Sequence, residues 1–386
     1  MEEDYLISIN YSGSHSTMYT TSYPINTQLN ETFYDESWAD EMEKVISIVV
    51  PIFFSIVALV GLFGNLLVVM VVTFNKQMRN TTNLLILNLA VADILFIVFC
   101  VPFTATGYAL PHDWPFGDYW CKIVQFLIYG TAFISIYTLV LMSLDRFLAV
   151  VYPIESMTWR TERNCRIAIS LVWFFTVLFC LPVFTAHGEV VTPITNHSYC
   201  IFLNNQTVSF LPESWNIRWS LLIFQVSFLG SAYLFPLLLI IGLYSVMLYR
   251  LWTKEPVGRV SAESIKNKKR VIKMVMIVVL IFTLSWLPIH IILLLRSLNL
   301  YESTPMNMTF QIIAHILAYS NSCVNPILYA FLSEPFRRGF WAVITCIRPS
   351  GPHGVHRNGY EMADIKHVKD GRGNSKCGEE KSKGDN

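Results

Sequence analysis

Long runs of apolar residues, separated by short polar stretches, dominate the pattern of this chain. Six runs carry no Asp, Glu, Lys or Arg, and another, Asn80–Pro111, carries only Asp93. Each run reaches the roughly 20 residues that a helix needs to cross a bilayer. A β-barrel would show alternating segments of about 10 residues instead. The pattern predicts seven transmembrane helices, of which the uncharged ones are Val45–Asn75, Ile123–Leu144, Ile167–Ala186, Trp219–Tyr249, Met274–Leu295 and Ser303–Ser333.

Composition supports a membrane protein. The chain of 386 residues is 53% hydrophobic and only 14% charged, whereas soluble domains are about a quarter charged. This excludes a disordered chain, a coiled coil and an ordinary cytosolic enzyme. A net charge of +1 gives no reason to expect nucleic acid as a partner. The eight cysteines include no CxxC pair, so the sequence predicts no metal site of that kind.

Lys and Arg concentrate in alternate connections between the predicted helices. Connections 1–2, 3–4 and 5–6 hold 2, 4 and 8 of them, whereas the N-terminus and connections 2–3, 4–5 and 6–7 hold one each. Because positively charged connections stay in the cytoplasm, the N-terminus is predicted outside and the C-terminus inside. We therefore expect a multi-pass protein of the plasma membrane.

Asn-x-Ser/Thr sequons give a second indication of sidedness. Five of the six lie on the predicted outer side, whereas Asn80 lies in a cytoplasmic turn that glycosylation does not reach. The candidate glycosylation sites are Asn10, Asn30, Asn196, Asn205 and Asn307.

Polar segments flank the predicted bundle, 45–333. Residues 1–44 hold nine acidic residues and one Lys, typical either of a solvated tail or of an acidic segment that concentrates a basic ligand. Residues 334–347 predict a short amphipathic helix on the inner leaflet, because apolar and basic residues segregate to two faces. Cys346 at its end is either a palmitoylation site or a free thiol. Residues 348–386 predict a disordered cytoplasmic tail.

Polar side chains within membrane helices are costly and mark candidate functional positions. Either Asp93 binds a small cation with nearby oxygen ligands, or it is protonated and hydrogen-bonded to its neighbours. At the cytoplasmic end of the third helix, Arg146 either anchors the helix among lipid headgroups or has a functional role. The polar residues that could surround Asp93 are Ser135, Asn321, Ser322 and Asn325.

The outer end of the bundle carries its own candidates. Gln125, His290 and His315 lie at similar depth in the outer halves of their helices, which favours a ligand cavity. Cys121 and Cys200 both face the oxidising side and are candidates for a disulfide.

Short motifs lie in a fixed order along the predicted helices. They are Gly64-Asn65, LNLAVAD ending at Asp93, WPFG at Trp114–Gly117 with Cys121, Asp145-Arg146-Phe147, Trp173, Pro236 with Tyr244, Trp286-Leu287-Pro288 and Asn325-Pro326-Ile327-Leu328-Tyr329. Over about residues 45–346 the chain resembles the rhodopsin-like (class A) G-protein-coupled receptors. The segment SIYTLVLMSLDRFLAVVYPI, followed by Arg160-Thr161-Glu162, is similar to receptors for galanin and for A-type allatostatins.

The resemblance implies a fold and a set of roles. The fold would be an all-α membrane protein, a seven-transmembrane helix bundle followed by the short amphipathic helix. Cys121 and Cys200 would form the family's disulfide. Asp93, Ser135, Asn321 and Ser322 would hold an allosteric sodium ion. The activation switch would comprise Ile136, Pro236, Phe282, Trp286, Asn325, Pro326 and Tyr329. Asp145, Arg146 and Tyr244 would act in G-protein coupling. The ligand would contact Gln125, Tyr129, His290, Leu293, Arg296 and His315.

Departures from the family pattern narrow the expected ligand classes and the expected restraints on the resting state. Ile128 stands where amine receptors carry an Asp, and the seventh helix presents Tyr319 and no Lys for retinal. Together with a long outer loop and an acidic N-terminus, this favours a peptide ligand. Ser285 precedes Trp286 in place of the usual Cys. The sixth helix has Lys268 rather than an acid near Arg146, so the resting state must be restrained by Asp145 and packing.

We therefore expect a neuropeptide receptor that catalyses nucleotide exchange on a heterotrimeric G protein of the inhibitory Gi/o type. The expected partners are an extracellular neuropeptide, the G protein, arrestin, receptor kinases and the lipid bilayer. No nucleophile, base and orienting group occur together, so we expect no enzyme. The alternative is a transporter or proton-coupled carrier built around Asp93, for which the chain lacks the usual internal repeat.

Overall fold

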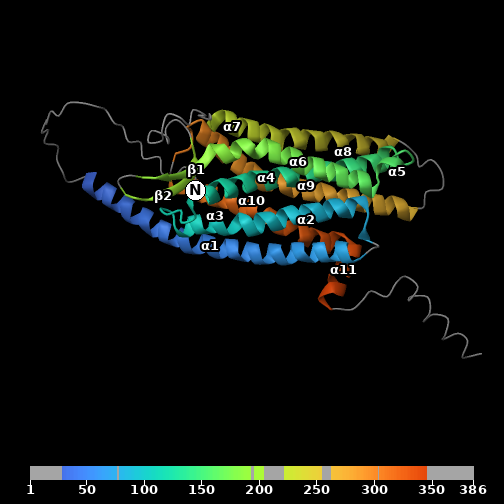
Figure 1. Cartoon of the computed structure of the whole chain (residues 1–386), viewed down its shortest axis with the longest axis horizontal. Coiled ribbons are helices and arrows are strands. Elements are labelled where there is room, and N and C mark those ends of the chain that lie inside the picture. Colours follow the sequence, from blue (N-terminus) through green and yellow to red (C-terminus); the bar gives the residue numbers. More distant parts are fainter. Residues whose placement is uncertain are drawn as a thin grey trace, which may run out of the picture. The chain divides into compact units, whose positions relative to one another are not determined.

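The computed structural model describes residues 28–75, 78–192, 195–203, 221–253, 262–302 and 304–345. These residues are helical except for loops and one two-stranded sheet, and the long helices lie side by side (Figure 1). In chain order the helices are α1 Gln28–Phe74, α2 Thr81–Phe99, α3 Val101–Ala109, α4 Gly117–Val151, α5 Ser156–Trp159, α6 Glu162–Ala186, α7 Leu221–Phe228, the π-helix η2 Leu229–Leu234, α8 Phe235–Thr253, α9 Ala262–Ser297, α10 Pro305–Leu332 and α11 Glu334–Ile344.

Six of the predicted membrane helices are long and apolar enough to cross a bilayer in the described part of the chain. They are Glu41–Phe74, Thr81–Ala109, Gly117–Val151, Glu162–Ala186, Leu221–Arg250 and Val275–Ser297. The seventh predicted helix corresponds to α10, which has 28 residues but is less uniformly apolar. Several of its polar residues are buried, among them Gln311, Asn321 and Asn325.

Prolines interrupt two of the predicted helices. The second consists of α2 and α3, which meet at Cys100, two residues before Pro102. The fifth contains η2, and Pro236 follows at the start of α8. Proline has no N–H and its ring clashes with the carbonyl four residues earlier, so a wider turn before it relieves the clash. The backbone carbonyl of Ser231, within η2, accepts a hydrogen bond from the Tyr137 hydroxyl at 3.0 Å.

Helix α4 lies at the centre of the bundle, where it packs against α2, α6 and α8. Helix α1 packs against α2, α3 and α10. The approach of α1 to α10 is close at Gly64, where an added Cβ would lie 2.9 Å from Cβ of Pro326. The next residue, Asn65, donates a hydrogen bond from its side-chain amide to the carbonyl of Ser322, one helical turn before Pro326, at 2.9 Å. The Gly64-Asn65 motif therefore fixes α1 against α10.

The departure from an all-helical fold is a hairpin between α6 and α7. Strand β1, His187–Val191, pairs antiparallel with β2, Ser198–Phe202. The hairpin and α3 lie at one end of the bundle, and α5 lies at the other (Figure 1). We call these the hairpin end and the Arg146 end.

Helix α11 follows α10 after a single residue, Ser333. The Phe336 ring is 1% exposed and packs against the ring of Tyr329 at 5.5 Å between centroids. The helix ends at Ile344, three residues short of the predicted limit. Several predictions fall outside the described residues: residues 1–27 of the N-terminal tail, glycosylation at Asn10 and Asn205, palmitoylation at Cys346, and the tail 348–386.

Candidate functional site

A disulfide fixes the hairpin to the bundle. Cys121 at the start of α4 is bonded to Cys200 on β2, with 5.5 Å between the Cα atoms. The Asp118 carboxylate supports the same attachment, because it accepts a hydrogen bond from the Glu189 backbone N–H at 3.1 Å and pairs with Lys122. The hairpin is thereby held across the mouth of the bundle.

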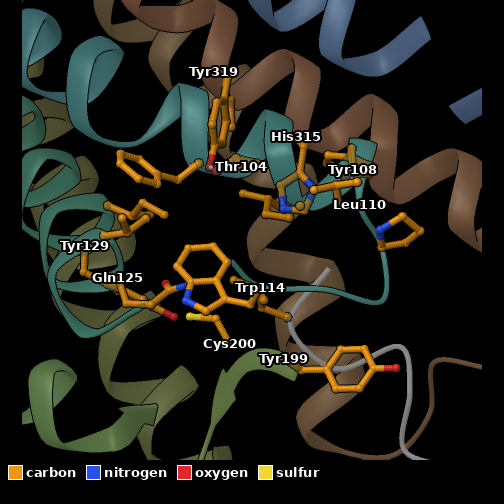
Figure 2. A pocket seen from close by; sticks show the side chains of 18 of the residues that line it. Thr104, Tyr108, Leu110, Trp114, Gln125, Tyr129, Tyr199, Cys200, His315 and Tyr319 are labelled. Carbon is orange, nitrogen blue, oxygen red and sulfur yellow. Dashed lines mark hydrogen bonds between the residues drawn. The ribbon is translucent and has the colours of Figure 1, made fainter. Parts of the chain in front are cut away.

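Beneath the hairpin lies a cavity of about 150 Å³, which we call the main cavity. It is bordered by α3, the α3–α4 loop, α4, β2, α9 and α10. Gln125 and Tyr129 of α4 lie across it from Tyr108 and His315 (Figure 2). Four of the six predicted ligand residues line this cavity: Gln125, Tyr129, Leu293 and His315.

The other two predicted ligand residues lie elsewhere. Arg296 borders a smaller cavity next to the main one, which we call the second cavity. His290 borders neither cavity in the described part of the chain; it is 4% exposed and packs against Phe228 and Tyr233, with ring centroids 5.1 and 5.0 Å away. His290 is therefore positioned to support the cavity wall from behind rather than to face a ligand.

Two hydrogen-bonded pairs join α3 to α10 beside the main cavity. The Tyr108 hydroxyl bonds Nδ1 of His315 at 2.7 Å, and the Thr104 hydroxyl bonds the Tyr319 hydroxyl at 2.8 Å. Sequence reasoning missed Thr104 and Tyr108, because a hydroxyl in an apolar helix carries no signal until its partner is known. Together the pairs give this wall of the cavity a polar, fixed surface.

Two of the predicted switch residues, Trp286 and Phe282, lie at the main cavity or directly against its lining. Trp286 forms part of its lining, and Phe282 stacks on Trp286 with 5.8 Å between centroids and 29° between the ring planes. Ile136 on α4 is 2% exposed. A ligand that enters the main cavity can therefore press directly on Trp286.

Asp93 is buried midway along the bundle. Its carboxylate is 2% exposed and accepts a hydrogen bond from the Asn325 amide at 3.0 Å, with Ser322 also in hydrogen-bond contact. No cationic side chain among the described residues pairs with it. A buried carboxylate with neutral oxygen-bearing neighbours fits a small monovalent cation, since such an ion would compensate its charge. The remaining members of the predicted set, Ser135 and Asn321, are buried as well.

At the Arg146 end, Asp145 collects several donors. It pairs with Arg146 at 3.1 Å and with Arg160 at 2.8 Å. The Thr81 and Thr82 hydroxyls each donate to the same carboxylate at 2.9 Å. Among the described side chains, the ion pair of Arg146 is therefore with the adjacent Asp145 and not with an acid of α9.

Two predicted tyrosines are buried near this end. Tyr244 is 6% and Tyr329 1% exposed. The Tyr329 hydroxyl and Nε of Arg146 have no hydrogen-bond partner within the described residues. Buried polar atoms without a partner are rare and costly, so these two are suited to a partner that another conformation supplies.

Comparison with known proteins places this geometry in a family. A model described as "7 transmembrane receptor (rhodopsin family)" matches residues 64–329. The chain belongs to this family. It is 54% identical over 310 residues to the allatostatin-A receptor of Bombyx mori, covering 80% of this chain and 82% of that protein. It is 37% identical to the galanin-like G-protein coupled receptor npr-9 of Caenorhabditis elegans, covering 81% and 77%, and 36% identical to human galanin receptor type 1, covering 79% and 83%.

Membership of the rhodopsin family makes the protein a multi-pass membrane receptor rather than an enzyme. The seven-helix fold follows from the six apolar spans together with α10. The similar proteins are neuropeptide receptors of the galanin and allatostatin-A type, which agrees with a peptide receptor. The arrangement provides a cavity at one end, a packed switch below it, and a restrained arginine at the other end.

Proposed function

We propose that the protein is a receptor for an allatostatin-A-type peptide. The observation that carries the proposal is the 54% identity to the Bombyx mori allatostatin-A receptor, against 36–39% to the galanin receptors it also matches. The main cavity supports it, because polar and aromatic side chains line a space open under the hairpin. The hairpin end then faces outward, where an oxidising compartment maintains the Cys121–Cys200 disulfide.

The peptide acts on the G protein by favouring one of two states of the bundle. Bound in the main cavity, it contacts Trp286, which stacks on Phe282 of the Pro288-containing helix α9. Movement of α9 opens the Arg146 end, and Arg146 then leaves Asp145 to contact the G protein. A sodium ion at Asp93 favours the resting state when bound. We propose a Gi/o-type G protein, with arrestin and receptor kinases as later partners of the active state.

The direct test is ligand-induced nucleotide exchange. Membranes from cells that express the protein receive synthetic allatostatin-A or galanin, and exchange on added Gi/o or other G proteins is measured. We expect allatostatin-A to act at a concentration at least tenfold lower than galanin, with Gi/o responding. A response to galanin alone, or to neither peptide, would contradict the proposed ligand.

Variants in the main cavity provide the site test. Gln125→Leu removes a buried amide from the cavity wall and is expected to weaken peptide binding about tenfold. Ser245→Ala on α8 is the matched control, because its exposed hydroxyl bonds only the Ile241 carbonyl within the described residues. Equal binding by both variants would argue against this cavity.

A further inference from the structure

Two tyrosine hydroxyls join the π-helix η2 to two neighbouring helices. Tyr137 of α4 donates to the Ser231 carbonyl of η2 at 3.0 Å. Tyr233, within η2 itself, donates to the Thr283 carbonyl of α9 at 2.9 Å. Tyr233 is 4% exposed, and its ring packs against the His290 ring. One hydroxyl therefore joins η2 to α4, and the other joins it to α9.

The Thr283 carbonyl lies where Pro288 weakens the hydrogen bonding of α9. Pro288 has no N–H, so the Leu284 carbonyl lacks its usual donor from four residues further on, and the proline ring crowds the same carbonyl. Helices bend at such positions. Because Thr283 directly precedes Leu284, Tyr233 holds the backbone of α9 at the turn where the helix can bend.

Aromatic rings connect this hydrogen bond to the main cavity. Trp286 lines the cavity, and its ring centroid lies 6.3 Å from that of His290. The His290 ring lies 5.0 Å from the Tyr233 ring. Both separations are within the range of aromatic contacts. A displacement of Trp286 by a ligand therefore reaches Tyr233 through one intervening ring.

We infer that Tyr233 is a positioning residue for activation, whose hydrogen bond to the Thr283 carbonyl restrains α9 in the resting state and is lost when α9 moves. The inference rests on the proposed function, in which movement of α9 opens the Arg146 end. The bond is present in a structure where Arg146 is still paired with Asp145. A hydrogen bond is lost once donor and acceptor are about 3.6 Å apart, so a small shift of this turn relative to η2 breaks it.

The Tyr137 hydrogen bond is expected to be independent of this movement. It joins η2 to α4, which contains no proline over Gly117–Val151 and packs against α2, α6 and α8 at the centre of the bundle. The same π-helix thus has two hydroxyl–carbonyl bonds of similar length, one to a helix without a proline bend and one to a helix with such a bend. The two tyrosines therefore provide a test and a control of matched chemistry.

The experiment compares Tyr233→Phe with Tyr137→Phe. Each variant keeps the aromatic ring and loses one hydroxyl, so the packing of the side chain is preserved. The first measurement is nucleotide exchange on added G proteins without peptide, normalised to receptor at the cell surface. The second measurement is the affinity of the same receptors for synthetic allatostatin-A. Tyr233→Leu, which also lacks the hydroxyl, replaces Tyr233→Phe if that variant does not reach the surface.

Tyr233→Phe is expected to raise basal exchange about 2- to 10-fold, the effect of losing one neutral hydrogen bond that forms only in the resting state. It should also strengthen allatostatin-A binding by up to the same factor, because a larger fraction of receptors is then in the binding-competent state. Tyr137→Phe should leave both quantities close to those of the unmodified receptor. A purely structural role of Tyr233 would reduce surface expression without raising the affinity for the peptide.

Three results would overturn the inference. Basal exchange and affinity could be unchanged in Tyr233→Phe; both tyrosine variants could show the same rise, which would mean a general loosening of η2; or basal exchange and affinity could fall, which would place the bond in the active state. An unmodified receptor that does not respond to allatostatin-A contradicts the proposed ligand alone, because basal exchange still distinguishes the two tyrosine variants. A receptor that catalyses no exchange in any variant overturns the inference together with the proposed G-protein function.

Discussion

Replacing Asp145 by Asn should make the receptor active without ligand. The carboxylate holds Arg146 at 3.1 Å and is itself held by Arg160, Thr81 and Thr82. Asn keeps the shape of the side chain but loses the negative charge and one acceptor oxygen. Arg146 then loses the one ion pair that restrains it among the described residues.

The size of the effect follows from this contact. A hydrogen bond to a charged group contributes about 1.5–3 kcal/mol. If the pair forms only in the resting state, its loss shifts the resting-to-active ratio by about 10- to 150-fold, because each 1.4 kcal/mol is a factor of ten. The remaining contacts of residue 145 weaken in both states and contribute less to the difference.

The assay is nucleotide exchange on added G protein without peptide, normalised to receptor at the cell surface. Thr82→Val is the matched control, because it removes one hydrogen bond to the carboxylate at 2.9 Å and leaves the Arg146 pair intact. We expect basal exchange to rise at least several-fold in Asp145→Asn and to change little in the control. Basal exchange within a factor of two of the unmodified receptor, with normal peptide binding, would refute the restraining role of Asp145.

Three further predictions follow from the site. Cys121→Ala and Cys200→Ala should each reduce surface expression or peptide binding severely, since loss of a native disulfide costs about 2–5 kcal/mol. The double variant should be no worse than either single variant, because all three lack the same bond; additive losses would argue against pairing. Asp93→Asn should abolish the decrease in agonist affinity that sodium causes relative to potassium, and a persisting decrease would exclude a sodium site there. Arg146→Lys should bind peptide normally yet lose at least tenfold in nucleotide exchange, because an ammonium lacks the planar donors of guanidinium; near-normal exchange would indicate a lipid anchor.

The helices could be predicted because hydropathy is a local property. A run of apolar residues crosses the bilayer wherever it occurs, so the spans followed from the sequence without any long-range information. The interruptions within the second and fifth helices were harder to predict. Proline at 236 permits a kink, but the sequence does not show that the π-helix before it contacts α4, where the Tyr137 hydroxyl bonds the Ser231 carbonyl. The hairpin between α6 and α7 was not predicted, because its strands are short and it is held by the Cys121–Cys200 disulfide, whose two residues are 79 positions apart in the sequence.

The level of the candidate site along the helices could be predicted, but the directions in which its side chains point could not. His290 and Leu293 lie at similar levels of α9, which the sequence shows. Three residues of an α-helix rotate by about 300°, so the two side chains point some 60° apart. Leu293 faces the main cavity, while His290 faces Phe228 and Tyr233. Which face of a membrane helix meets a cavity depends on the helices packed around it. The sequence of one apolar helix does not show which helices those are.

The second cavity shows why polar residues need a structure before they become informative. Gln225 and Gln311 were visible in apolar segments, but an amide in a membrane helix usually bonds a neighbouring helix. Only the structure shows that these two amides and His187 from the hairpin line the same small cavity. Since one of these residues comes from the loop region, which varies more than the helices, receptors with the same bundle can differ at this cavity.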